Sequence, residues 1–185
     1  PSKYFLSYMN YSLAIYEKDQ NVASIHAYCY PITCLPRLFF IRGADCWGWA
    51  TWKRSWVDFE KDGIRLLDLL NKNKLSFKFN LFGSYNYIKM LENQIAKRND
   101  SWAIRWHASN FIDNKLTLYP GRSLVRNIGT DGSGTNFKTV DNSYSADFIE
   151  EPFEFDKIPI KESKFARNMF ALFFFKRKIK IFSQK

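Results

Sequence analysis

Hydrophobic and polar positions follow two different periods along this chain, and the alternation between them predicts helices interleaved with strands. Apolar residues at helical spacing mark the segments 4–18, 64–70, 83–97 and 101–113. Short apolar runs bounded by proline, glycine or polar residues mark strands at 22–28, 38–42 and 116–119. Because helices and strands alternate, the pattern predicts an α/β fold.

The helix expected at 101–113 carries the most unusual pattern. Asp100 stands where an N-cap residue would accept hydrogen bonds from the free N–H groups of the first turn. One face, expected to point to a core, holds Ile104, Ala108, Phe111 and Ile112. The other side holds Trp102, Arg105, Trp106 and Ser109, which is an unusual set to leave in water. Spacing alone favours a structural cap over a catalytic acid for Asp100.

Composition indicates a single domain with a substantial core. The chain has 185 residues, of which 46% are hydrophobic and 18% are aromatic. The aromatic share is high, and aromatic rings either bury large areas or offer flat faces to sugars and bases. The net charge of +10 would attract phosphorylated donors, anionic membrane surfaces or nucleic acid.

Cysteine and histidine usage does not spell out a metal site. The three cysteines form no Cys-x-x-Cys pair, and only two histidines are present. We interpret His26, alone on an expected strand, as a core histidine with satisfied hydrogen bonds. No signal-peptide pattern is found, and the longest apolar run, 169–175, is too short to span a bilayer. These features favour reduced thiols and a cytoplasmic location, with peripheral attachment to the inner face of the membrane as an option.

The character of the chain changes after residue 140. Residues 141–160 are acidic and interrupted by proline, which is typical of a linker or an irregular wrap. Residues 161–185 are basic and rich in phenylalanine. Two interpretations stay open for this tail: a terminal helix docked on the body, or an interfacial anchor whose cations meet anionic lipid.

Several segments resemble bacterial sugar transferases of the GT-A type, in glycosyltransferase family two and its relatives. The most specific is Cys46-Trp47-Gly48-Trp49-Ala50-Thr51-Trp52-Lys53, and 99–110, 116–129 and 131–135 match the same group. Together they cover about residues 4–135, so residues 1–140 would form the matching domain. The resemblance implies a partial GT-A fold with a mixed sheet flanked by helices. The family's acidic cluster for metal and diphosphate lies just before a segment like 1–6, so we expect the nucleotide-binding half to be missing.

The resemblance also implies an activity: inverting transfer of a sugar from a nucleotide-sugar donor to a glycan or lipid-linked acceptor in cell-surface polysaccharide synthesis. Asp100 would be the base, and the complete enzyme would need a divalent metal, Mn or Mg, whose ligands this chain does not supply. Asn136 stands where relatives often have a metal-binding histidine and is a poorer ligand.

The residues expected to bind substrate follow from the same resemblance: Trp47, Gly48, Trp49, Arg105, Trp106, Asn127 and Asp131. Trp47 and Trp49 would form an acceptor wall in which the glycine allows close approach, although both could instead be core residues. We assign Trp52 and Trp56 to packing. Arg105 could equally be a surface arginine. The glycine-rich loop 129–135 is either an ordinary loop or a flap over the donor.

Two other function classes remain open at this stage. One is a basic aromatic module for nucleic acid, which the charge permits but no recognisable motif supports, so nucleic acid is an unlikely partner. The other is a carbohydrate-binding remnant without catalytic activity.

Overall fold

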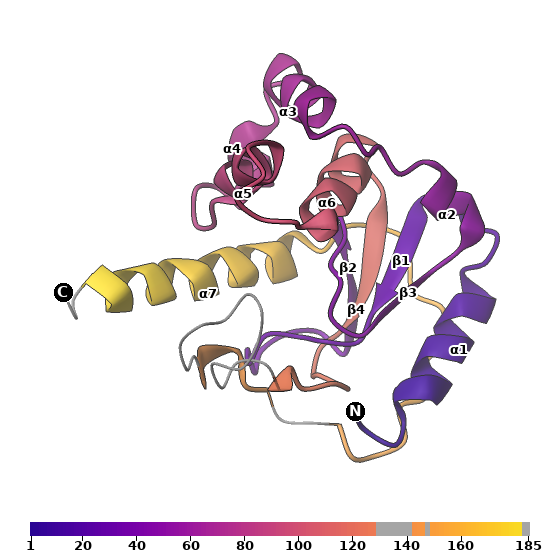
Figure 1. Ribbon diagram of the computed structural model, residues 1–185. Helices are drawn as coiled ribbons and strands as arrows, with labels where there is room; N and C mark the ends of the chain where they lie inside the picture. Colours follow the sequence, from indigo (N-terminus) through magenta and orange to yellow (C-terminus); the bar gives the residue numbers. More distant parts are fainter. Residues whose placement is uncertain (129–141, 147–148, 183–185) are drawn as a thin grey trace.

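The computed structural model describes residues 1–128, 142–146 and 149–182 (Figure 1). Within these residues a four-stranded sheet has the order β2-β4-β1-β3. The strands are β1 (Val22–His26), β2 (Leu38–Arg42), β3 (Trp49–Thr51) and β4 (Leu116–Pro120). β1 and β4 are parallel, whereas β3 on β1 and β2 on β4 are antiparallel. The predicted α/β architecture, with helices flanking a mixed sheet, is confirmed.

The structure contains each helix that the sequence pattern predicts, and also short helices that it does not predict. The helices are α1 (Phe5–Ile15), α2 (Lys53–Val57), α3 (Gly63–Lys72), α4 (Ser76–Phe79), α5 (Tyr87–Ile95), α6 (Trp102–Ile112) and α7 (Lys164–Phe182), with a 3-10 turn at Asn142–Tyr144. The helix expected over 83–97 begins only at Tyr87, because Leu81, Phe82 and Gly83 take positive φ and form a turn. The short elements β3, α2 and α4 were not predicted.

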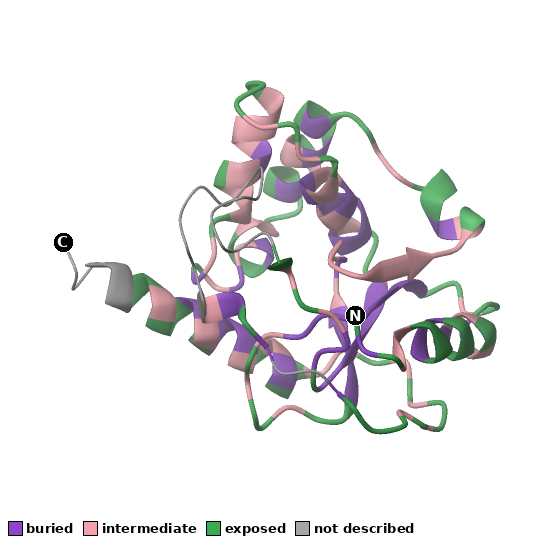
Figure 2. Cartoon of the chain, turned by 60° about the horizontal axis from the view of Figure 1, so that its bottom comes forward, coloured by how far each residue is buried: buried purple, intermediate pink, exposed green. Residues whose placement is uncertain are grey.

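The two faces of the sheet belong to different cores, because side chains alternate along each strand. Phe40 and Leu118 point to the side covered by α1 and pack with Tyr8 and Tyr16. Phe39 and Tyr119, their neighbours in sequence, pack on the opposite side with residues of α7. Figure 2 shows the three longer strands as buried and β3, at the edge of the sheet, as intermediate.

Helix α6 lies between two hydrophobic clusters. Its predicted core face is confirmed, since Ile104, Ala108 and Phe111 pack with α3, α4 and α5. The prediction for its other side was wrong at Trp106, which is 1% exposed and packs with Ala23 and Ala44. The sheet covers this side of the helix, so the tryptophan is a core residue rather than one left in water.

The predicted N-cap at Asp100 was also wrong. Ser101 is the N-cap of α6, and its hydroxyl accepts a hydrogen bond from the Ile104 N–H at 3.3 Å. The Asn99 side-chain oxygen accepts from the Ser101 N–H, which fixes the approach to the helix. Asp100 is exposed. Serine and aspartate cap helices about equally well, so the pattern could not decide between adjacent residues.

The C-terminal region packs on the body of the molecule. Phe170 and Phe174 of α7 enter the same core as Phe39 and Tyr119, as the docked-helix interpretation of the tail expects. Before α7, the extended segment that holds Phe153 and Phe155 packs against Tyr8 of α1. Of the helices in the described part of the chain, none has the length and apolar character needed to cross a bilayer.

Candidate functional site

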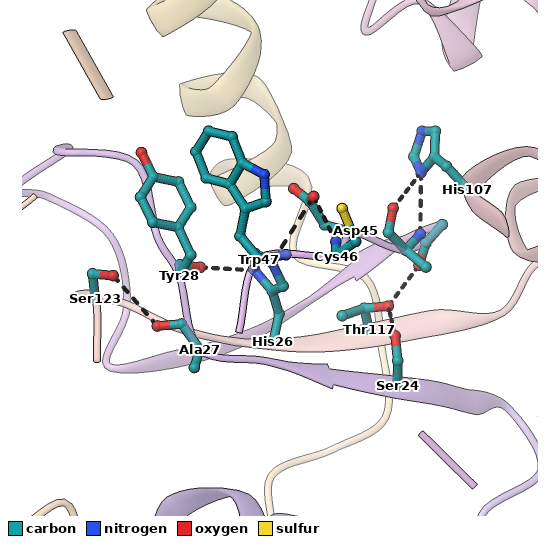
Figure 3. Close-up of polar contacts among 12 residues, drawn as sticks. Ser24, His26, Ala27, Tyr28, Asp45, Cys46, Trp47, His107, Thr117 and Ser123 are labelled. Carbon is teal, nitrogen blue, oxygen red and sulfur yellow. Dashed lines mark hydrogen bonds and ion pairs between the residues drawn. The ribbon is translucent and has the colours of Figure 1, made fainter. Parts of the chain in front are cut away.

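The site is built on the loop that follows β2. Gly43 has a φ of +95°, which turns the chain away from the sheet. The Thr117 hydroxyl of β4 donates to the Gly43 carbonyl at 2.7 Å, and its oxygen lies 2.6 Å from the Ser24 hydroxyl of β1 (Figure 3). Since the Thr117 proton is used by the carbonyl, Ser24 donates to Thr117. Two neighbouring strands thus fix the position from which Ala44, Asp45 and Cys46 leave the sheet.

These residues border a cavity of ≈ 140 Å³, which we call the aromatic cavity. Its walls come from six parts of the chain: the loops after β1 and β2, α5 with the segment that leads into it, helix α6, the 3-10 turn at Asn142–Tyr144 and helix α7. The lining residues are Tyr30, Ala44, Asp45, Cys46, Trp47, Tyr85, Tyr87, Met90, Ala103, Ile104, His107, Tyr144 and Phe174. Asp45 is the one acidic residue among them, so the described part of the wall presents one carboxylate among largely aromatic side chains.

Asp45 lies against His26, but the two do not form an ion pair. The carboxylate oxygen Oδ1 accepts from the Cys46 N–H at 2.7 Å and lies 3.9 Å from His26 Nε2 (Figure 3). That nitrogen accepts from the Trp47 N–H at 3.0 Å, and Nδ1 lies 2.8 Å from the Tyr28 carbonyl. His26 is therefore neutral and protonated at Nδ1. Burial lowers the pKa of His26, although Asp45 partly opposes this. The prediction of a core histidine with satisfied hydrogen bonds is confirmed.

His107 of α6 also lines the aromatic cavity. Its Nδ1 lies 2.8 Å from the Ala44 carbonyl oxygen and 3.1 Å from the Ala44 nitrogen. Because the carbonyl is an acceptor only and is the nearer partner, Nδ1 carries the proton. The ring stacks on Phe79 at 4.9 Å between centroids. Burial lowers the pKa of His107 to about 4, against the pull of the Asp45 carboxylate, so this ring is neutral at pH 7.

Three phenols and one thiol of the wall are held neutral as well. Burial raises the pKa of Tyr30, Tyr85 and Tyr87, and the Asp45 carboxylate raises each pKa further. Burial, followed by Asp45, raises the pKa of the Cys46 thiol to about 12, so the thiolate needed of a nucleophile is absent near neutral pH. The cavity offers neutral phenols, flat rings and one carboxylate, which suits a neutral polyhydroxy ligand.

The two tryptophans expected to share one wall belong to different groups of rings. Trp47 borders the aromatic cavity and packs edge-on against Tyr28, with ring centroids 4.8 Å apart. Trp49 instead joins a cluster of indoles with Trp56, Trp102 and Trp106. Residues i and i+2 would share a face in a regular strand, but Gly48 has a φ of +59° and breaks the alternation.

The remaining predicted substrate residues are dispersed. A Cβ on Gly48 would lie 2.8 Å from the side chain of Val125. The space left by the missing side chain of this glycine is therefore filled by Val125. Arg105 donates from Nη1 to the Lys61 carbonyl at 2.9 Å. Asn127 is half-buried, and Asp131 lies outside the described residues, as does Asn136 with the glycine-rich loop. Asp100 is exposed and is not among the residues that line the aromatic cavity.

The tryptophans assigned to packing differ in exposure. Trp52 is half-buried and donates from its indole nitrogen to the Leu13 carbonyl at 3.2 Å. Trp56 packs on Trp106 at 5.2 Å between centroids but is itself 42% exposed. The indole of Trp106 is buried, and its nitrogen has no hydrogen-bond partner among the residues that the structure describes. This second group of rings forms a partly exposed aromatic surface beside α6.

No metal site is found among the residues that the structure describes: no three His, Cys, Asp or Glu side chains gather there in a suitable group. Comparisons with protein-family models, with curated proteins and with solved structures found no match to this chain.

Sequence reasoning missed most of the residues that meet in the cavity. One signal for Asp45 was present, because a Gly-Ala-Asp sequence directly after a strand places a carboxylate at the end of the sheet. Nothing in the sequence joins Tyr30, Tyr85, Tyr144 and Phe174, which come from distant segments. His107 could have been found from its spacing, since it follows Ala103 and Ile104 on the helix that borders the cavity.

Proposed function

We propose that this chain binds a sugar acceptor in the aromatic cavity and belongs to a glycosyltransferase that uses a nucleotide-sugar donor. The observation that carries the proposal is the single carboxylate, Asp45, within a wall of tyrosine and tryptophan rings. Rings pack on the apolar faces of sugars, while carboxylate and phenol groups bond to their hydroxyls. The resemblance of the segment around Trp47 to GT-A sugar transferases gives independent support.

The size of the cavity limits the ligand. A water molecule needs about 10–15 Å³ of such space, so ≈ 140 Å³ accommodates a group about the size of one sugar ring. A longer acceptor would place one residue in the cavity and extend outside it. The net charge of +10 favours approach of an anionic glycan, a lipid-linked diphosphate or a nucleotide-sugar.

In this proposal Asp45 replaces Asp100 as the general base, because Asp100 does not border the cavity. An acceptor hydroxyl beside Asp45 would give its proton to the carboxylate as its oxygen forms the bond to the donor's anomeric carbon. The bond from that carbon to the diphosphate breaks, and the diphosphate leaves with the electron pair. His26 would position Asp45 through its bond to the Trp47 N–H and through its ring, which blocks one side of the carboxylate.

The first test is binding. Saturation-transfer NMR with a panel of mono- and oligosaccharides should detect binding that Trp47→Ala weakens at least tenfold. Trp56→Ala, which removes an indole outside the cavity, is the matched control and should leave binding unchanged. If no saccharide receives saturation, or if only the control variant reduces binding, the cavity is not an acceptor site.

The second test concerns the base and uses the full-length product of the native gene with nucleotide-sugars and Mn²⁺. Asp45→Asn retains the oxygen that accepts from the Cys46 N–H, so the fold and sugar binding should persist. Transfer should fall by about 10²–10⁴, because an amide cannot take the proton. Asp100→Asn should stay within a few-fold of wild type. The reverse result would assign the base to Asp100 and remove Asp45 from the proposal.

A further inference from the structure

Helix α7 carries apolar residues on the side that faces away from the body of the protein. Phe165, Leu172 and Ile179 recur every seven residues, a spacing that drifts by only about 20° per repeat around a helix. Phe175 lies three residues after Leu172 and therefore on the same side. We call these four residues the outer stripe. All are exposed: Leu172 is 42%, Phe175 40% and Ile179 67% exposed.

The opposite side of α7 is already occupied. Phe170 contacts Phe39 and Tyr119, and Phe174 contacts Tyr30 and borders the aromatic cavity. Arg177 donates to the hydroxyl of Ser143 at 2.7 Å. The outer stripe therefore cannot be the face by which α7 docks on the sheet. Figure 1 shows the helix running from the sheet to the edge of the molecule.

The charges on α7 indicate what kind of partner binds the outer stripe. From Lys164 to Phe182 the helix has six basic residues and no acidic one: Lys164, Arg167, Lys176, Arg177, Lys178 and Lys180. Of these, Lys164, Lys176 and Lys178 are exposed beside the outer stripe. A second copy packed stripe to stripe would bring these cations together, which is unfavourable. Nucleic acid would meet the cations but would leave Leu172 and Ile179, which have no flat ring for stacking, against charged phosphate.

We propose that the outer stripe of α7 is a docking surface for an anionic lipid bilayer. The apolar side chains enter the boundary between headgroups and acyl chains, and the flanking lysines bind acidic headgroups. Attachment would be reversible, because one short stripe buries little apolar area. Phe174 lies on the other side of the same helix, so the aromatic cavity would be held within about one helix diameter, roughly 10–12 Å, of the lipid surface. The proposal itself does not depend on what the cavity binds.

The test is co-sedimentation with vesicles of phosphatidylcholine alone or with a quarter phosphatidylglycerol. Binding should require the anionic lipid and weaken at least tenfold between 0.05 and about 0.5 M salt. The triple variant Leu172→Ser, Phe175→Ser, Ile179→Ser should lose at least tenfold in affinity. Its matched control is Leu6→Ser, Val57→Ser, Ile64→Ser, which removes three apolar residues of other helices that are 66%, 75% and 66% exposed, and should bind as wild type.

Two further measurements keep the test decisive. Lys176→Glu with Lys178→Glu should abolish binding to anionic vesicles while the melting temperature stays near wild type, which covers the case in which the triple variant folds poorly. Light scattering after gel filtration reports self-association. The proposal would be overturned if the folded triple variant sedimented with vesicles as well as wild type does. It would also be overturned if the wild-type protein did not bind vesicles but formed a dimer that the triple variant abolishes. Binding of the protein to single-stranded DNA, without binding to any vesicle, would overturn it as well.

Discussion

At the scale of single residues, two glycines shape the site. Gly43 and Gly48 both take positive φ, and each is packed so closely that a Cβ would clash. At Gly43 the added carbon would lie 2.5 Å from Cε1 of His107, whose ring is held against the Ala44 backbone. Glycine is needed there both for the turn and for the approach of α6 to the loop that holds Asp45.

The substitution Gly43→Ala should therefore destabilise the fold and displace His107. Gly83→Ala is the matched control, because Gly83 also has positive φ but its Cβ would meet only Phe77, at 3.8 Å. We expect the free energy of unfolding to fall by roughly 1–2 kcal/mol in the control, from backbone strain alone, and by more in Gly43→Ala. Urea unfolding measures both, and the imidazole resonances of His107 report its displacement. Equal losses would mean that the ring adapts to the extra carbon without cost.

At the scale of elements, the parts of the fold that could be predicted are those specified locally. Strand β2 matches its apolar run residue for residue, and α6 buries the face that its spacing predicts. Trp106 could not be assigned from spacing, because whether its side of α6 meets water or the sheet depends on distant strands. β3 is too short for periodicity to detect, and pairing with β1 rather than its own sequence stabilises it.

Two neighbouring phenylalanines on α7 also differ in their surroundings. Phe174 is 3% exposed and packs on Tyr30 and Tyr85, whereas Phe175 points to solvent. Phe174→Ala should lower the free energy of unfolding by about 3–5 kcal/mol, as expected for a large ring removed from a core. Phe175→Ala should change it by less than about 1 kcal/mol. Chemical denaturation of the two variants makes the comparison, and similar losses would show that α7 docks in another orientation.

At the scale of the whole molecule, the aromatic cavity depends on elements that are far apart in sequence. The sheet supplies Asp45 through the loop after β2, α6 supplies His107, and α7 closes one side with Phe174. The candidate site was therefore less predictable than the fold. Trp47 stands within the motif of residues 46–53 and Asp45 directly precedes it, but their partners are fixed only when α7 packs on the sheet. If α7 also rests on lipid, the cavity wall and the membrane contact share one helix.

His26, which is buried, and His107, which is half-buried, make the stability of the whole molecule depend on pH. Burial lowers the folded-state pKa of both, to about 4 for His107, whereas an unfolded histidine titrates near 6.5. Between these values the unfolded chain binds more protons than the folded protein, so the free energy of unfolding should rise with pH. The stabilisation is fully present above pH 6.5 and is lost as the pH falls toward 4.

The histidine contribution can be isolated with His107→Asn, because carboxyl groups also titrate near the acidic end of this range. Asparagine can still bond to the Ala44 backbone but does not titrate. In urea unfolding between pH 4.5 and 6.5, each histidine adds up to about 1.4 kcal/mol per pH unit, so the slope for His107→Asn should be lower by up to that amount. The variant should be less stable than wild type at pH 7 and closer to it at pH 4.5. An unchanged slope would mean that His107 is protonated in the folded protein at pH values where burial should keep it neutral.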